Sequence, residues 1–378
     1  MDEHQSQSNS YSSLRVELVY EDESGARLAD GNAIFFWAKV LLPYFMGQFG
    51  SDAIRTDLRE SAKTLEVILT GNPVPNAMMK GVGRNPQIRI NLGLYVALLS
   101  MSNTMLFLRE IAGQETVTRD ALFNLKAPER LVDELLQLMI LWHKSSQSGW
   151  TIQSWPQQLI IPDPNYIFPA LFFVMAHEFS HYYRDIILNR DWVEERNRLA
   201  IKMIDDFLVE KEYISARGLD DEAVREVLKD TKAKASWGDE IGGDQWAFQA
   251  CMERFSPSYG GPRIGMTGTA ATPLVYEPRV QSDRESRMYA NIAAELVFGI
   301  TKFLEAFADK MMGKRGSLES HPPATWRQEL FVYTMARTEK QPMMKFMGQE
   351  YGSGLMTRIV MDSMLKQFVD RMENTAKS

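Results

Sequence analysis

The sequence contains a single cysteine, Cys251, and only five histidines among its 378 residues. One cysteine excludes a disulfide framework and also a zinc site built from cysteine ligands. No apolar run approaches the length of about 20 residues that a helix needs to cross a bilayer. A net charge of −7 at pH 7 argues against a general nucleic-acid-binding protein. We therefore expect a soluble, cytoplasmic protein with no nucleic-acid partner and no transmembrane segment.

Hydrophobic residues make up 45% of the chain, which is enough to form a substantial core. Their periodicity predicts a mainly α fold with a small β-sheet, an α+β architecture. Residues 1–13 are polar and are expected to form a disordered head and not a signal peptide. We expect an N-terminal α+β subdomain over residues 14–150 and a helical subdomain over residues 151–378.

The individual elements follow from the same patterns. Strands are predicted at residues 14–20, 64–70 and 87–91, with a Gly- and Pro-rich loop over residues 71–86. The third strand is a candidate edge strand for pairing with an extended peptide, and an ordinary interior strand fits its pattern equally well. The predicted helices cover residues 32–49, 92–111, 118–144, 166–183, 192–217, 220–235, 289–312, 323–336 and 351–374.

Two of the five histidines fall in the run His177-Glu178-Phe179-Ser180-His181, inside a long apolar segment that is predicted to be a buried helix. Residues four apart lie on one face of a helix, so both imidazoles can bind the same metal ion. Glu178 stands beside the first histidine and can take a proton from a water molecule at the metal. The alternative is a pair of satisfied core histidines with Glu178 facing water.

A catalytic zinc ion usually takes three protein ligands and keeps one coordination position open. The best source of a third ligand is a later acidic segment, in which Glu240 and Asp244 are spaced four apart. Gly242 and Gly243 lie between them and would let two helices approach closely around an ion. We predict that Glu240 is the ligand and that Asp244 accepts the free N–H of a ligating histidine. Asp239 or Asp244 as the ligand, or a solvated acidic helix start, remain the alternatives.

The order of three short motifs carries a resemblance. The His-Glu-x-x-His run is followed about 60 residues later by Glu240-x-x-x-Asp244, and then by His321-Pro322-Pro323 with Arg327 downstream. This arrangement resembles the gluzincin zinc metallopeptidases, in particular the CAAX prenyl endopeptidase and HtpX group. The chain departs from that group in having no transmembrane helices. It also has a looser similarity to the phage-exclusion peptidase Lit.

The resemblance implies a zincin-like core whose active-site helix carries the His-Glu-x-x-His run. It also implies that His321 helps to stabilise the tetrahedral intermediate, with Arg327 as a possible support for the substrate or the transition state. A histidine before two prolines can also serve only to form a turn, which needs no chemistry. The zinc ligands that the resemblance implies are His177, His181 and Glu240.

These observations lead us to expect a zinc-dependent endopeptidase that hydrolyses peptide bonds of a cytoplasmic protein, with Glu178 as general base and His321 as a second catalytic residue. Its partner would be a protein or peptide substrate, and nothing in the sequence points to a particular oligomeric state. One alternative is a non-catalytic protein in which zinc stabilises a helical interaction module. Another is a regulatory or phage-defence protease that acts on one specific host protein.

Overall fold

The described part of the protein is mostly helical with one small sheet, so the predicted mainly α composition is confirmed. In the computed structural model the described residues are 18–21, 27–28, 66–70, 72, 74–80, 87–91, 93–98, 100–102, 105, 129–145, 164–186, 190–255, 282–313 and 317–377. The predicted head at residues 1–13, the predicted helix at residues 32–49 and the predicted boundary near residue 150 lie outside these ranges. Among the described helices, none is long and apolar enough to cross a membrane.

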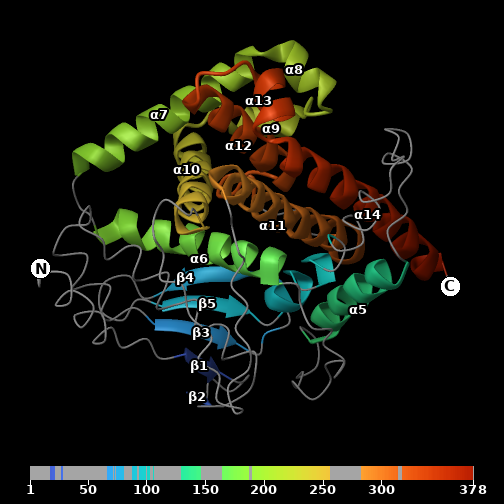
Figure 1. The fold of residues 1–378 in the computed structure, drawn as a ribbon. Coiled ribbons are helices and arrows are strands. Elements are labelled where there is room, and N and C mark those ends of the chain that lie inside the picture. The colour runs from blue at the N-terminus through green and yellow to red at the C-terminus, as the bar shows by residue number, and fades with distance from the viewer. Residues whose placement is uncertain are drawn as a thin grey trace, which may run out of the picture.

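The sheet has five strands in the order β2-β1-β3-β5-β4. Strands β1, β3 and β5 run parallel to one another, whereas β2 and β4 are antiparallel to their neighbours β1 and β5. Strand β4 forms the edge of the sheet that lies beside helix α6 (Figure 1). The strand bounds are Leu18–Glu21 for β1, Arg27–Leu28 for β2, Glu66–Thr70 for β3, Ala77–Lys80 for β4 and Gln87–Asn91 for β5.

The candidate edge strand was placed wrongly. Residues 87–91 form β5, which is an interior strand paired with β3 on one side and β4 on the other. The edge next to the helices is β4, which lies within the segment 71–86 that was predicted to be a loop. Its sequence Ala-Met-Met-Lys has no β-branched or aromatic residue, and turn-forming residues precede it. Pairing with β5 therefore determines its conformation more than its own propensity does.

Helices make up the rest of the described chain. The predicted helix at residues 192–217 is two helices, α7 and α8, and the one at residues 220–235 comprises α9 and the start of α10. The short helix α13 was not predicted. The helix bounds are Glu129–Ser145 for α5, Pro164–Ile186 for α6, Arg190–Val209 for α7, Lys211–Ala216 for α8, Glu222–Val227 for α9, Thr231–Phe255 for α10, Asp283–Met312 for α11, Ala324–Thr338 for α12, Met343–Gln349 for α13 and Gly352–Lys377 for α14.

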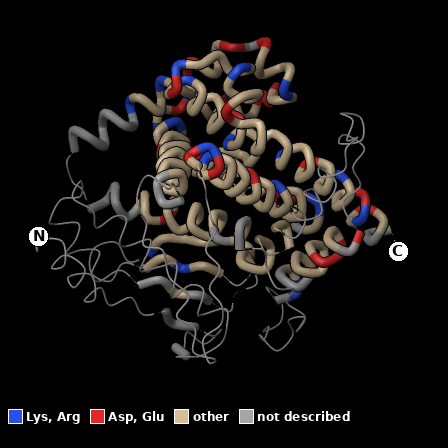
Figure 2. The backbone as a smooth tube through the Cα atoms, viewed as in Figure 1, with Lys and Arg blue, Asp and Glu red and all other residues tan. Residues whose placement is uncertain are grey.

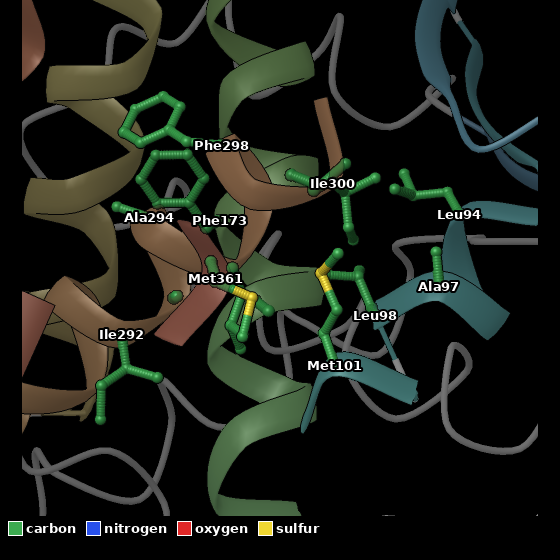
Figure 3. Close-up of a cluster of buried hydrophobic side chains, with 14 of the residues drawn as sticks. Leu94, Ala97, Leu98, Met101, Phe173, Ile292, Ala294, Phe298, Ile300 and Met361 are labelled. Carbon is green, nitrogen blue, oxygen red and sulfur yellow. The ribbon is translucent and has the colours of Figure 1, made fainter. Parts of the chain in front are cut away.

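The main hydrophobic core surrounds α6, which packs against α10, α11 and β4. In Figure 3, Phe173 of α6 lies against Phe298 of α11, with ring centroids 6.4 Å apart. Met361 of α14 joins this cluster, as do Leu98 and Met101 from the helical residues after β5. Each such buried side chain stabilises the fold by about 1.5–3 kcal/mol. Charged residues lie mainly on the outer elements, including the region of α8, α9 and α13 (Figure 2).

A second hydrophobic cluster lies between α7, α8, α9, α10 and α12. Trp237 of α10 and Trp326 of α12 meet edge to face, with ring centroids 6.1 Å apart. The indole N–H of Trp237 also donates to the Leu318 carbonyl at 2.8 Å, just ahead of α12. Phe207 of α7 covers both Trp326 and Tyr333. This cluster holds the start of α12 beside α10, which matters because both helices contribute residues to the site described next.

Candidate metal centre

Three potential metal ligands lie together where α6 packs against α10: His177, His181 and Glu240. The two Nε2 atoms are 3.2 Å apart. Glu240 oxygens lie 3.4 Å from the Nε2 of His177 and 3.6 Å from that of His181. Tetrahedral ligands about 2.1 Å from a zinc ion lie about 3.4 Å from one another. The spacing therefore fits a single ion of this size. Asp239, the alternative third ligand, does not belong to this group among the described residues.

Gly243 allows the close approach of the two helices. A Cβ atom at this position would lie 3.0 Å from the ring atoms Cε1 and Nδ1 of His177 and 2.8 Å from the Oγ of Ser180. Both distances are shorter than a comfortable van der Waals contact. A side chain at this position would force the Ser180 hydroxyl and the His177 ring to shift. The sequence predicted this steric use for both Gly242 and Gly243, and the structure shows it for Gly243.

Asp244 contacts the potential ligand His177 on the side of the ring away from the other two ligands. Its side chain is fully buried, and its Oδ1 lies 2.9 Å from the Nδ1 of His177, the ring nitrogen that does not face the other ligands. A carboxylate here accepts the Nδ1–H and so directs the Nε2 lone pair toward a metal. Burial alone would raise the pKa of Asp244, but Arg327 and His177 outweigh burial and lower it. Glu240, and not Asp244, thus belongs to the group that could hold a metal ion, and Asp244 contacts that group through His177.

The same surroundings act on the histidine. Burial alone would lower the pKa of His177, yet Asp244 and Glu240 raise it to about 9 against the opposing charge of Arg327. The raised pKa favours the protonated form of the imidazole. A metal ion that binds Nε2 must displace that proton, because only the neutral ring is a ligand.

Arg327 makes a closer connection to this cluster than the sequence indicated. Its Nε and Nη2 atoms both donate to the Asp244 carboxylate at 2.7 Å, which is a bidentate pair. Its Nη1 lies 3.4 Å from a Glu240 oxygen, and its Nη2 is 3.4 Å from both ring nitrogens of His177. Arg327 was predicted as a support for the substrate or the transition state. The structure shows it engaged with Asp244, which contacts His177, and close to the potential ligand Glu240.

Glu178 and His321 complete the arrangement, because both line the cavity of about 650 Å³ that contains the three ligands. Desolvation raises the pKa of Glu178; Glu240 adds to this, whereas His177 and Arg327 oppose it. The Met79 backbone N–H of β4 also donates a hydrogen bond to this carboxylate. His321 is more open, with 66% of its side chain exposed, and its Nε2 lies 3.7 Å from a Glu240 oxygen.

The cavity has two walls that the sequence did not predict. One is β4 with the residues ahead of it, and the other is one face of α11 that ends at Glu305. The length and amphipathic pattern of α11 were visible in the sequence, but that pattern does not say which neighbours its face meets. The newly placed lining residues are Pro75, Asn76, Ala77, Met78, Met79, Val297, Ile300, Thr301, Leu304 and Glu305.

If the group holds a metal ion, replacing Asp244 by asparagine should weaken metal binding about 10- to 100-fold without abolishing it, because the amide is a poorer acceptor for the His177 N–H. A competition titration against a chelator measures this, with Glu240→Gln as the matched amide variant at a ligand position. We expect Glu240→Gln to lose more affinity than Asp244→Asn. Retention of zinc by Glu240→Gln together with complete loss in Asp244→Asn would reverse the two roles.

The chain matches no protein-family model, no curated protein and no solved structure. The chemistry of the site therefore has to follow from its own residues. Among the described residues, these form a His-His-Glu group close enough to hold a metal ion, with a buried carboxylate and an arginine behind it.

Proposed function

We propose that this protein is a zinc-dependent endopeptidase of gluzincin type, which hydrolyses peptide bonds of a protein substrate. One observation carries the proposal: Glu178 lies in the same open cavity as the three potential ligands, beside the edge of a β-sheet. A structural zinc site is normally closed by a fourth protein ligand and has no use for a base beside it. This favours catalysis over the alternative of a zinc-stabilised interaction module.

Each of these cavity residues has a different role in the proposed hydrolysis. Zinc held by His177, His181 and Glu240 would supply Lewis acidity and lower the pKa of water in the site. Glu178 takes the proton of the attacking water and passes it to the leaving amine. His321 stands at the mouth of the cavity, where its imidazole can donate to the oxygen of the scissile carbonyl as negative charge develops there.

Strand β4 offers a means of holding an extended substrate. The Met79 N–H points toward Glu178 and so away from β5, which places one backbone edge of β4 on the cavity side. Backbone groups of an edge strand can pair with an added peptide strand, which gives affinity that is independent of the peptide sequence. A zincin-like core with β4 as its substrate strand is therefore part of the proposal.

Metal analysis together with a search for new protein N-termini tests this function. Purified wild type should contain one zinc ion per chain, and a His177→Ala, His181→Ala double variant should contain none. Added to a cell extract, the wild type should create new N-termini that a chelator abolishes and that the double variant does not create. Undiminished zinc in the double variant, or the same N-termini from both proteins, would show that the proposal is wrong.

Replacing His321 by alanine should lower turnover about 10²- to 10³-fold, because a donor aimed at the developing oxyanion is lost. Zinc content should stay at the wild-type level, since the imidazole is not one of the three ligands. Steady-state kinetics on a cleaved peptide, with zinc measured in the same sample, distinguishes the possible roles. Unchanged turnover would make His321 a turn residue, and zinc lost in parallel with activity would make it a ligand.

A further inference from the structure

Helix α11 forms a mostly apolar wall of the metal cavity. Val297, Ile300, Thr301 and Leu304 share one face, because they are spaced three and four residues apart. Glu305 follows at the end of this face and also lines the cavity. The wall therefore combines an apolar stripe with one carboxylate, and neither is used by the reaction described above.

The carboxylate of Glu305 has only one partner among the described residues. Its two oxygens lie 2.8 and 3.0 Å from the backbone nitrogen of Ala324, the first residue of α12. An ionised carboxylate offers about four acceptor positions, so a single N–H leaves most of this capacity unused. The neighbouring cations have other partners, since Arg327 is paired with Asp244 and Lys302 with Asp362 at 2.7 Å.

The electrostatics agree with an unmatched carboxylate. Desolvation raises the pKa of Glu305 to about 7, and the Ala324 N–H, Arg327 and Lys302 offset this only in part. The residue as a whole is nevertheless exposed to solvent, so that a ligand can reach it. A cation placed beside it would favour the ionised form and gain a charge-assisted hydrogen bond.

We propose that Glu305 determines specificity by selecting substrates that place a lysine or arginine side chain along α11. The inference rests on the proposed peptidase function. The aliphatic stem of such a side chain would lie against Val297, Ile300 and Leu304, while its charged end meets the Glu305 carboxylate. A purely apolar side chain of the same length would use the stripe but leave the carboxylate without a partner.

Two small zinc-binding probes test the proposal without a known substrate. Arginine hydroxamate and norleucine hydroxamate share the metal-binding group and a similar stem, and only the first carries a charged end. We expect zinc-loaded wild type to bind arginine hydroxamate about 10-fold more tightly, as measured by calorimetry. Glu305→Gln keeps an acceptor for the Ala324 N–H but loses the charge, so both probes should bind it equally. Asp309→Asn removes the same charge one turn further along α11, outside the cavity lining, and should keep the preference.

Different results would contradict the role of Glu305 in specificity and the proposed peptidase function. Equal binding of the two probes to zinc-loaded wild type, or binding of neither, would overturn the role in specificity while the metal site stands. A preference that survives in Glu305→Gln, or a loss of affinity for both probes alike, would mean that Glu305 only caps α12. Absence of zinc from the wild type would instead overturn the proposed function itself.

Discussion

Replacing Glu178 by glutamine is expected to remove peptide-bond hydrolysis while leaving the fold and the zinc in place. The amide has nearly the same shape, and its oxygen can still accept the hydrogen bond from the Met79 N–H of β4. It cannot accept a proton from water at neutral pH, and a general base typically contributes about 10²–10⁴ in rate. Glu178 is not one of the three potential ligands, so zinc content should not change.

Turnover of a cleaved peptide, with zinc quantified in the same sample, measures this effect. Glu178→Asp is the matched control, because it keeps a carboxylate but withdraws it by one methylene, and it should retain part of the activity. Cleavage by Glu178→Gln at the wild-type rate would exclude Glu178 as the base. Loss of zinc from Glu178→Gln would mean that the side chain helps to hold the metal.

Replacing Arg358 by methionine is expected to destabilise the protein by about 3–5 kcal/mol. Arg358 is only 4% exposed and pairs with two buried carboxylates, Glu295 and Glu329. Burial alone would lower the pKa of Arg358, but these two carboxylates outweigh it and raise the pKa above its ordinary value. Without the guanidinium, Glu295 would keep only the neutral donors Tyr351, at 2.7 Å, and Gln328. Glu329 would keep the Tyr213 hydroxyl at 2.6 Å and a more distant cation, since the Nε of Arg217 lies 3.8 Å away.

Urea unfolding of wild type and variant measures this loss of stability. Arg371→Met is the matched control on the same helix, because its pairs with Glu129 and Asp133 are exposed. That control should change the free energy of unfolding by no more than about 0.5 kcal/mol. Adding Glu295→Gln to Arg358→Met should restore part of the stability, since one unpaired charge disappears. A loss below about 1 kcal/mol in Arg358→Met would show that water or other groups solvate the carboxylates.

The sequence predicted the His-His-Glu group better than its surroundings. The spacing of His177 and His181, and of Glu240 and Asp244, is a local property of a helix, so it could be read before the helices were placed. The bidentate pair between Arg327 and Asp244 joins residues 83 positions apart, and no local pattern encodes that contact. Only the order of the motifs brought Arg327 into consideration.

Strand β4 is a feature that the sequence did not predict. Its four residues have no strand pattern, and the short spacing from the turn residues Pro73 and Pro75 favoured a loop. Its conformation depends on hydrogen bonds to β5, which a reading of propensity along the chain does not contain. The face of α11 that lines the cavity was missed for a similar reason, because packing partners follow from the fold and not from periodicity.

Three consecutive residues of α12 face two different interiors. Arg327 points to the metal centre, whereas Gln328 and Glu329 bind Glu295 and Arg358 in the buried charge cluster. A one-residue insertion ahead of Arg327 would turn this stretch by about 100° and remove all of these partners together. The contacts of both clusters therefore depend on the same helical register of α12. Length changes in the segment between His321 and Arg327 should therefore be tolerated far less well than side-chain substitutions there.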